Sequence, residues 1–260
     1  MRNCVIIPTY NEAENINVVL EALLKIKDLD ILVVDDNSPD GTGKMVEEWK
    51  TKSDGRVNIL SRTEKNGLGG AYLYGFAHCL NEQYEVICEM DADLSHDPES
   101  LPALIEAVHK GKGDLAIGSR YIEGGQVPDW PIWRRFLSVG GNLYARIILG
   151  LKVNDATAGF RAYNSELLRR IVQNPIKADG YGFQIEMTYI THNLGGKIVE
   201  VPICFRDRVR GNSKMGMSIV VEAISLVTWW GIRDRVFRRR KYGKWQENQQ
   251  MVDTNNGRKS

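Results

Sequence analysis

The sequence lacks an excess of charge of either sign. Its 260 residues contain 34 Lys and Arg and 33 Asp and Glu, which gives a formal net charge of +1. A nucleic-acid-binding domain usually carries a marked basic surplus, so nucleic acid is not an expected partner. A hydrophobic content of 43% is enough for a buried core. The length predicts one α/β domain followed by a tail.

Cysteine and histidine are scarce, with four residues of each. The cysteines are widely spaced, and three lie in apolar runs typical of strands, which indicates reduced core thiols of a cytoplasmic protein. The histidines show no metal-ligand spacing, and neither HExxH nor GxSxG occurs. Hydrolase chemistry based on histidine is therefore not expected. The residues concerned are Cys4, Cys79, Cys88, Cys204, His78, His96, His109 and His192.

A hydrophobic run long enough to span a membrane is also lacking. The N-terminus has no long apolar segment of the kind found in signal peptides. The run Met217–Ile232 is shorter than the roughly 20 apolar residues that a spanning helix needs, and it contains Glu222. We therefore expect neither a signal peptide nor a transmembrane helix.

Short β-branched runs alternate with amphipathic stretches in the first half of the chain. This pattern predicts βαβ units and a mainly parallel sheet covered on both faces. Asn11 and Glu14 have the spacing of a helix capping box, and Pro98 suits the first turn of a helix. Further strands and helices are expected at Lys197–Phe205, Glu166–Val172 and Phe183–His192. The strands expected in the first half are Cys4–Pro8, Ile31–Asp35, Val57–Ser61, Val86–Met90 and Leu115–Gly118.

Two aspartates, Asp91 and Asp93, follow the fourth of these strands. In open α/β sheets, ligands bind beyond the carboxyl ends of the strands. Two carboxylates one residue apart can share a divalent cation that also bridges diphosphate oxygens. A helix cap or a solvated turn is the alternative explanation of such a tripeptide, and the strand end before it favours the metal site.

A second acidic cluster, Asp35–Gly41, follows the second strand. It could be an ordinary turn, but adjacent carboxylates at a strand end need a hydrogen-bonding or cationic partner. The hydroxyls or base edge of a nucleoside could supply one. Tyr10, after the first strand, could stack on the base while Glu12 accepts hydrogen bonds from the sugar. The glycine-rich stretch 66–70 matches no phosphate-binding motif and predicts a tight turn that lets a helix pack closely.

Basic residues suited to phosphate are Arg120, Arg208 and Lys214. Arginine offers a planar fork for phosphate oxygens, and Lys214 adds a point charge from a glycine-containing segment. A surface salt bridge is the alternative for each of them.

The second half begins with a Gly/Pro loop, Glu123–Pro131, and a helical stretch that starts near Trp133. Near the C-terminus, the apolar run Met217–Ile232 precedes a basic cluster. An apolar helix with two tryptophans beside cationic residues is typical of a helix that lies in the headgroup region of a membrane. A core helix followed by a solvated charged segment is the alternative. The cluster comprises Arg233, Arg235, Arg238, Arg239, Arg240 and Lys241.

Eight segments together resemble the dolichol-phosphate mannosyltransferase group of glycosyltransferase family 2, including the bacterial polyprenol monophosphomannose synthases. The resemblance runs in order over residues 3–217 and rests on IIPTYNEAENI, VVDDNSPDGT, KNGLGGAYLYGF, EMDADLSHDP, IGSRY, TAGFRAY, GYGFQIE and EVPICFRDRVRGNSKM. It implies a GT-A fold, GDP-mannose as donor, a polyprenyl phosphate as acceptor, and Mg²⁺ or Mn²⁺ as cofactor.

The resemblance also implies roles for particular residues. Asp91 and Asp93 would hold the metal, with Ala92 beside them at the diphosphate. Ser95 stands where some members have glutamine, a departure that puts its role as a further metal ligand in question. The residues expected at the nucleotide are Pro8, Tyr10, Glu12, Val34 and Asp36, and those expected at the phosphates of donor and acceptor are Arg120, Arg208 and Lys214.

The expected mechanism follows from charge. An acceptor phosphate is anionic at neutral pH, so the enzyme needs no strong general base and has to hold two anions in line. Attack opposite the leaving group would invert an α-linked donor to a β-mannosyl phosphate lipid. Two alternatives stay open: a polyprenyl-phosphate glucosyltransferase or other hexosyltransferase that uses a UDP-sugar with the same acceptor, and a nucleotide-sugar-binding regulator without activity.

The expected organisation has three parts. Residues 1–216 form the catalytic domain, with a nucleotide-sugar half at 1–120 and an acceptor half at 121–216. Residues 217–241 form a membrane-surface helix with its basic cluster, which the region from Trp130 to Phe136 would assist, and 242–260 form a disordered polar tail. The protein is expected to be peripheral, on the cytoplasmic face of a membrane, held by this helix or by a separate membrane protein.

Overall fold

The computed structural model describes residues 2–63, 67–178, 180–207 and 217–237. The strands are β1 (Asn3–Thr9), β2 (Leu29–Asp35), β3 (Val57–Ser61), β4 (Val86–Glu89), β5 (Leu115–Ser119), β6 (Arg161–Asn164) and β7 (Ile198–Pro202). The α-helices are α1 (Ile16–Leu23), α2 (Thr42–Lys52), α3 (Gly67–Asn81), α4 (Leu101–His109), α5 (Ile132–Leu149), α6 (Ser165–Ile171), α7 (Gly180–Asn193) and α8 (Met217–Phe237). The expected strands and helices of the first half are confirmed to within two residues at the strand ends.

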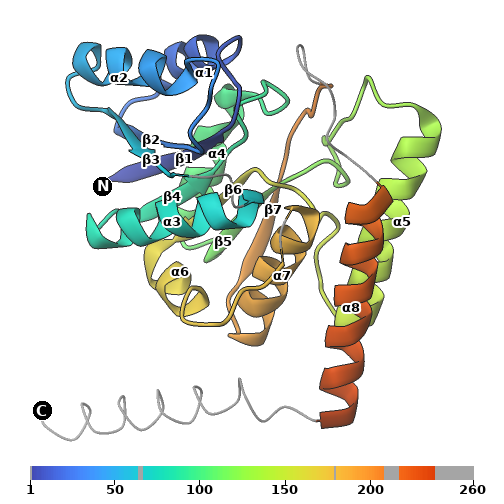
Figure 1. The fold of residues 1–260 in the computed structure, drawn as a ribbon. Coiled ribbons are helices and arrows are strands. Elements are labelled where there is room, and N and C mark those ends of the chain that lie inside the picture. The colour runs from blue at the N-terminus through green and yellow to red at the C-terminus, as the bar shows by residue number, and fades with distance from the viewer. Residues whose placement is uncertain (1, 64–66, 179, 208–216, 238–260) are drawn as a thin grey trace, which may run out of the picture.

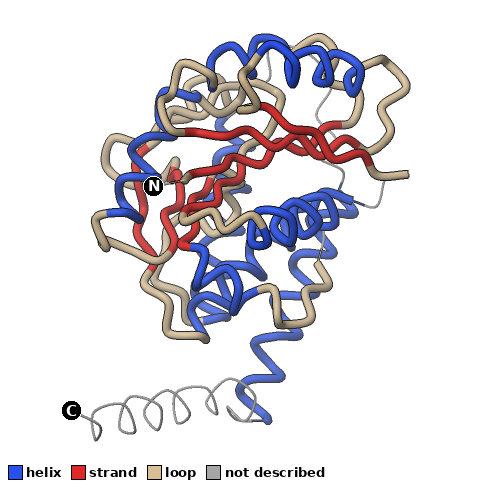
Figure 2. The backbone as a smooth tube through the Cα atoms, turned by 90° about the vertical axis from the view of Figure 1, so that its left-hand side faces the viewer, coloured by secondary structure: helices blue, strands red, loops and turns tan. Residues whose placement is uncertain are grey.

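The strands form one twisted sheet with helices on both faces (Figure 2). The strand order is β3-β2-β1-β4-β6-β5-β7. β1 pairs in parallel with β2 and β4, β2 with β3, and β5 with β7. β6 is antiparallel to both of its neighbours, β4 and β5. The sheet is mainly parallel, as predicted.

Side chains alternate between the two faces of the sheet, and each face has its own core. In β1, Ile6 belongs to the core beneath α3, α6 and α7, while Val5 and Ile7 belong to the core beneath α1, α2 and α4. Figure 1 shows these two helical layers on either side of the strands. Burial on both faces explains why the strands lack a polar alternation in sequence.

Two details of the fold differ from the sequence prediction. The predicted capping box at Asn11 is wrong, because α1 begins only at Ile16 and Asn11 adopts a positive φ of 60°. The backbone N–H of Asn11 instead donates to the Ser38 hydroxyl, 3.1 Å away. The strand β6 was not predicted, although it separates β4 from β5.

Helices α5 and α8 lie side by side at one end of the molecule (Figure 1). The Tyr144 and Thr228 hydroxyls form a hydrogen bond of 2.7 Å between them. Val227 and Trp230 of α8 are buried, and Trp230 stacks on Tyr189 of α7. Within the part of the chain that the structure describes, no helix combines the length and the apolar character needed to cross a bilayer.

Two helical glycines provide a test of the packing between α3 and the sheet. A Cβ at Gly75 would lie 2.8 Å from Ile6 Cγ2, whereas one at Gly140 on α5 would meet nothing within 4 Å. We expect Gly140→Ala to raise the free energy of unfolding by about 1 kcal/mol through helix propensity. Because of overpacking, the free energy of unfolding of Gly75→Ala should be about 1–3 kcal/mol lower than that of Gly140→Ala, as measured by unfolding in guanidinium chloride. Equal midpoints for the two variants would contradict this close contact.

Candidate active site

Three strand ends converge on one edge of the sheet. β1, β2 and β4 are parallel and adjacent, so the loops that follow them emerge side by side. These loops contain the sequence motifs that start at Pro8, at Asp35 and at Met90. The edge therefore brings together the residues expected to bind a nucleotide and those expected to bind a metal, as strand ends in open α/β sheets do.

Hydrogen bonds join the first two loops to each other. Thr9 Oγ1 donates to Asp35 Oδ1 at 2.7 Å, and the backbone N–H of Glu12 donates to Thr42 Oγ1 at 3.0 Å. Asp40 accepts from the backbone N–H of Ala13 and from Thr42. Burial raises the pKa of Asp40, but these hydrogen bonds outweigh that effect and hold its pKa below the usual value. The acidic cluster therefore builds the turn as well as lining the site.

Asp36 has a cationic partner that the sequence prediction missed. The Arg62 guanidinium binds both carboxylate oxygens of Asp36, at 2.6 and 2.8 Å. Arg62 also packs where a Cβ at Gly70 would stand, 2.9 Å from its Nη1, so the glycine-rich start of α3 allows the close approach that was expected. Val34 is fully buried in the core, so its predicted contact with the nucleotide stays a prediction.

The turn after β4 holds Asp91 and Asp93 in place. Asp93 Oδ1 accepts from the backbone N–H and from the hydroxyl of Ser95, at 3.0 and 2.5 Å. The hydroxyl of Tyr72, on α3, donates to Asp91 Oδ1 at 3.3 Å. Burial and the nearby carboxylates raise the pKa of Tyr72, which keeps this donor neutral. Ser95 thus orients the Asp93 carboxylate, and its role as a further metal ligand stays a prediction.

His96 lies beside the aspartate turn, although the sequence pointed to no role for this histidine. Its Nδ1 accepts from the backbone N–H of Asp91 at 3.4 Å. Its ring stacks on Phe160, with ring centroids 5.0 Å apart, and meets Phe205 edge-on. These contacts bury the imidazole and give it a role in shaping the aspartate turn.

A buried carboxyl lies directly behind the aspartate pair. Glu89 is the last residue of β4, and its Oε2 accepts from Gln184 Nε2 of α7 at 2.7 Å. Burial raises the pKa of Glu89 to about 7, against the lowering effects of Arg161 and Gln184. A Cβ on Gly159 would lie within 4 Å of both Gln184 Nε2 and Asp91 Oδ2. A buried hydrogen bond between Glu89 and Gln184 therefore lies close to Asp91.

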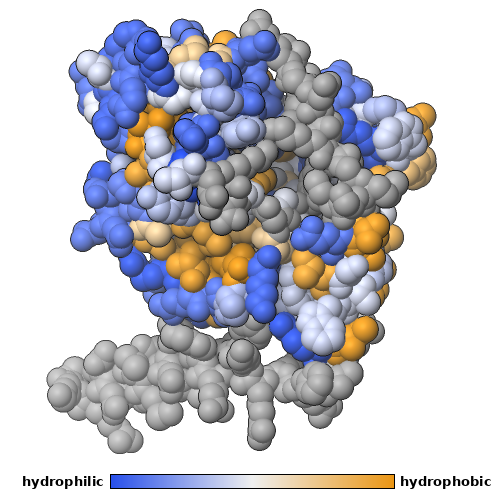
Figure 3. All heavy atoms as spheres, viewed as in Figure 1, coloured by the Kyte–Doolittle hydropathy of each residue, from blue (hydrophilic) through white to orange (hydrophobic). Residues whose placement is uncertain are grey.

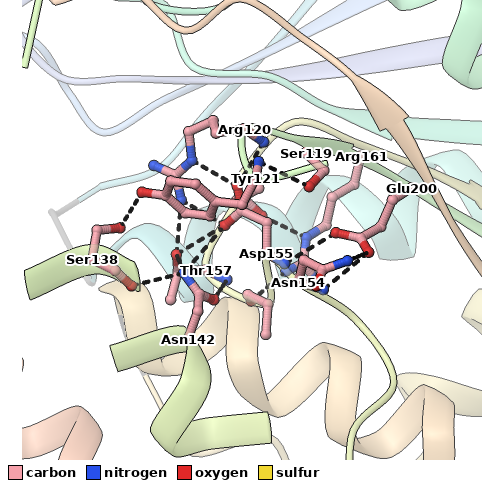
Figure 4. Close-up of polar contacts among 12 residues, drawn as sticks. Ser119, Arg120, Tyr121, Ser138, Asn142, Asn154, Asp155, Thr157, Arg161 and Glu200 are labelled. Atoms are coloured by element: carbon pink, nitrogen blue, oxygen red, sulfur yellow. Dashed lines mark hydrogen bonds and ion pairs between the residues drawn. The ribbon is translucent and has the colours of Figure 1, made fainter. Parts of the chain in front are cut away.

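Arg120 forms a buried ion pair rather than a surface salt bridge. Its Nε and Nη2 donate to the two oxygens of Asp155, at 2.7 and 2.6 Å, and Nη2 also donates to Thr157 Oγ1 at 2.8 Å (Figure 4). The side chains of Arg120 and Asp155 are 5% and 0% exposed. Burial raises the pKa of Asp155, but the guanidinium of Arg120 outweighs that effect and lowers it.

Aromatic rings connect Arg120 to the aspartate turn. The guanidinium carbon of Arg120 lies 5.3 Å from the ring centroids of Trp130 and Phe205. Phe205 contacts His96, and the backbone N–H of Arg206 donates to the carbonyl of Ser95 at 3.1 Å. Arg134 of α5 also lies over Trp130, with its guanidinium carbon 4.1 Å from the ring centroid. Packed aromatic rings and a backbone hydrogen bond therefore link Arg120 to the turn that contains Asp91 and Asp93.

The structure does not test every predicted residue. Arg208 and Lys214 lie outside the described residues, as do Arg238, Arg239, Arg240, Lys241 and the tail at 242–260. Pro8, Tyr10 and Glu12 do lie at the same edge, in β1 and the loop after it. Within the described ranges, no three His, Cys, Asp or Glu side chains form a metal cluster. A metal at Asp91 and Asp93 would need further oxygen ligands from a substrate.

Comparison with known proteins agrees with this geometry. Residues 4–172 match the family model described as glycosyl transferase family 2. The chain is 50% identical over 236 residues to an undecaprenyl-phosphate mannosyltransferase of Micrococcus luteus, covering 90% of this chain and 96% of that one. It is 48% identical over 241 residues to a polyprenol monophosphomannose synthase of Mycolicibacterium smegmatis, covering 92% and 90%.

A solved structure shares the fold. The mannosyltransferase PcManGT from Pyrobaculum calidifontis, solved in complex with GDP-Man and Mn²⁺, matches with a TM-score of 0.57 at 16% identity, covering 96% of this chain and 80% of that one. The mainly parallel sheet and its flanking helices define an α/β protein of the GT-A type. The chain belongs to glycosyltransferase family 2.

The buried pair of Arg120 and Asp155 leads to a prediction about stability and pH. Asp155→Asn would leave the guanidinium charge uncompensated, so at pH 7 we expect a loss of about 3–5 kcal/mol in the free energy of unfolding. The folded pKa of Asp155 is lowered, so its contribution is complete above the usual Asp pKa of about 3.9 and is lost as the pH falls through the folded value.

Denaturant unfolding between pH 7 and pH 3 would measure this difference. Glu48→Gln removes an exposed ion pair with Lys52 and serves as the control, with an expected change of about 0.5 kcal/mol or less. A difference between wild type and Asp155→Asn that stays constant down to pH 3 would rule out an ionic origin.

Proposed function

We propose that this chain is an inverting glycosyltransferase that moves mannose from GDP-mannose to a polyprenyl phosphate. The observation that carries the proposal is the aspartate pair, seated between the nucleotide-type loops of β1 and β2 and the buried Arg120. The names of the two bacterial relatives support mannose as the sugar and a polyprenyl phosphate as the acceptor. Because the chain covers 96% of the Micrococcus protein, nearly all of that relative has a counterpart here.

The donor site is assigned to residues 1–120 and the acceptor site to residues 121–216. GDP-Man and Mn²⁺ in the complex of PcManGT support GDP-mannose and a divalent ion as ligands here. Mg²⁺ and Mn²⁺ prefer oxygen ligands, and such sites often combine one or two carboxylates with substrate phosphates. Asp91 and Asp93 fit this requirement, because Ser95 and Tyr72 hold their carboxylates at the strand end. When bound, the ion would stabilise the negative charge on the departing diphosphate.

The reaction needs orientation more than proton transfer. An oxygen of the acceptor phosphate attacks C1 of mannose, the bond from C1 to the diphosphate breaks, and GDP leaves with both electrons of that bond. Because attack comes from the opposite face, the product is β-linked. The acceptor oxygen is already deprotonated, so this chain's task is to hold two anions in line. We assign Arg120 to the phosphates, with Arg208 and Lys214 in the same role from the segment that follows Phe205.

The apolar side of α5 supports a location at a membrane surface. Trp133 and Phe136 expose 66% and 74% of their surface, and Figure 3 shows apolar side chains along the flank formed by α5 and α8. Val221, Ile224 and Trp229 of α8 extend this apolar surface. Exposed apolar patches of this kind mark binding sites for membranes or proteins. A peripheral enzyme with this flank in the lipid could meet an acceptor whose chain stays in the bilayer.

Helix α8 has a buried side as well as the exposed side that could contact a membrane. The two interpretations of the sequence, a core helix and a surface helix, both describe it, because Val227 and Trp230 are buried while Trp229 is exposed. A deletion of residues 217–260 would therefore uncover the core beside α5 and α7, so point substitutions on the exposed surface test membrane binding better.

Activity should depend on the aspartate pair. We expect Asp93→Asn to lower mannosyl transfer at least about a hundredfold, on the scale of removing a key charge-stabilising group. The assay measures radiolabelled mannose passing from GDP-mannose into organic-extractable lipid with Mg²⁺ or Mn²⁺ present. Asp97→Asn, which alters only the cap of the turn before α4, serves as the matched control. Full activity of Asp93→Asn would refute the metal assignment.

The same assay separates the donor alternatives. Wild-type protein that transferred glucose from UDP-glucose and ignored GDP-mannose would be a glucosyltransferase with the same acceptor. Protein that bound either donor without forming lipid-linked sugar would be a regulator, which the family membership and the arrangement of the site do not favour.

Membrane binding should depend on the exposed side of α5. We expect the double substitution Trp133→Glu and Phe136→Glu to reduce sedimentation with anionic liposomes at least about tenfold, because each buried apolar side chain contributes roughly 1.5–3 kcal/mol. Val18→Glu on α1 changes an exposed apolar residue away from this flank and is the control. Unchanged sedimentation of the double variant would show that α5 does not contact the lipid.

A further inference from the structure

The first part of helix α5 presents polar side chains to the protein and mainly apolar side chains to its surroundings. The residues that face inward recur every three or four positions, as one side of a helix requires. In the first part of the helix these inward residues are polar, namely Arg134, Ser138 and Asn142. Polar residues that face inward need partners within the protein. The hydrogen-bond partners of Asn142 also bind Arg120.

Asn142 bonds to the loop between α5 and β6. Its Nδ2 donates to Thr157 Oγ1 at 3.1 Å and to Asp155 Oδ1 at 3.5 Å, and its Oδ1 accepts from the backbone N–H of Thr157 at 3.2 Å. Because one side of the amide meets an N–H and the other meets oxygens, only one orientation of the amide satisfies these bonds. Asn142 is buried, so water does not compete for them.

Asp155 and Thr157 in turn bind Arg120. Both oxygens of Asp155 and the hydroxyl of Thr157 accept from the Nε and Nη2 edge of the guanidinium (Figure 4). Glu200 of β7 fixes the other end of the loop, since its Oε1 accepts from the backbone N–H of Asp155 at 3.0 Å. Contacts of this loop with α5 and with β7 therefore fix the orientation of the Arg120 guanidinium.

We propose that Asn142 and Thr157 are positioning residues, which hold the pair of Arg120 and Asp155 where the acceptor phosphate must arrive. This inference rests on the proposed function, in which Arg120 contacts a phosphate. Asp155 already balances the charge of Arg120, so the direction of the guanidinium matters more than the net charge it adds. The helix whose outer side faces the lipid then also sets the arginine that meets the lipid's phosphate.

A double-mutant cycle tests whether Asn142 acts through Arg120. We expect Asn142→Ala to lower kcat/KM for the polyprenyl phosphate about tenfold, the scale of a lost hydrogen bond to a charged group, with the KM for GDP-mannose unchanged. In the Arg120→Ala background the same substitution should have no further effect. Equal losses in the two backgrounds would overturn the inference.

Two more variants keep the test decisive. Thr157→Val replaces by a methyl group the hydroxyl that accepts from Arg120 Nη2 and Asn142 Nδ2, and it should show the same dependence on Arg120 if Asn142→Ala does not fold. Tyr144→Phe breaks the bond to Thr228 on the same helix, and we expect it to lower Tm without changing kcat/KM. An equal loss of activity in Tyr144→Phe would instead indicate a general loosening of α5. Absence of transfer in the wild type would contradict the proposed function, whereas transfer in the wild type with equal losses in the two backgrounds would contradict the positioning role alone.

Discussion

Negative charge gathered at one strand end is the constraint around which this site is built. Glu89, Asp91 and Asp93 lie within five residues of the chain, at the edge of a buried sheet. Like charges this close repel one another unless hydrogen bonds or cations oppose the repulsion. A different hydrogen-bond donor contacts each of these carboxyl groups. Ser95 donates to Asp93, Tyr72 donates to Asp91, and Gln184 donates to Glu89, whose pKa burial raises to about 7.

This solution supports a divalent ion at the pair. Hydroxyl and amide donors orient the carboxylates without neutralising them, so their charge stays available to a cation. Two other carboxylates at the same edge are paired with arginines, since Arg62 binds Asp36 and Asp155 binds Arg120. The two kinds of carboxylate, paired and oriented, match the two tasks that we propose for the site, which are to shape the loops and to hold a metal.

Much of this architecture could be predicted from the sequence because its signals are local. Apolar runs followed by polar turns located β1, β2 and β4, and the same turns pointed to Asp36, Asp91 and Asp93. The resemblance to a family extended the prediction to the fold and the donor. Arg120 was identified as a candidate from its place after β5, although its buried pairing with Asp155 was not expected.

The rest depends on contacts between residues far apart in the chain. Arg62 is 26 residues from Asp36, and Asp155 is 35 residues from Arg120, so no local pattern connects them. β6 has only four residues, one of them the buried Arg161, and its hydrophobic pattern is too weak to predict a strand. The sequence indicated no role for His96, because it does not have the spacing of a metal ligand. In the fold it contacts a backbone N–H and two aromatic rings.

Helix α5 shows why amphipathic patterns alone do not determine which side of a helix is buried. The usual assumption turns the apolar side inward. Here the inward positions Ser138 and Asn142 bond to polar partners near Arg120, while Trp133 and Phe136 point outward. The reversal has a physical reason if the outer medium is lipid, because apolar side chains then lose nothing by facing outward. A substrate with an anionic head and an apolar tail needs these two surroundings close together, and one helix with a polar and an apolar side provides both.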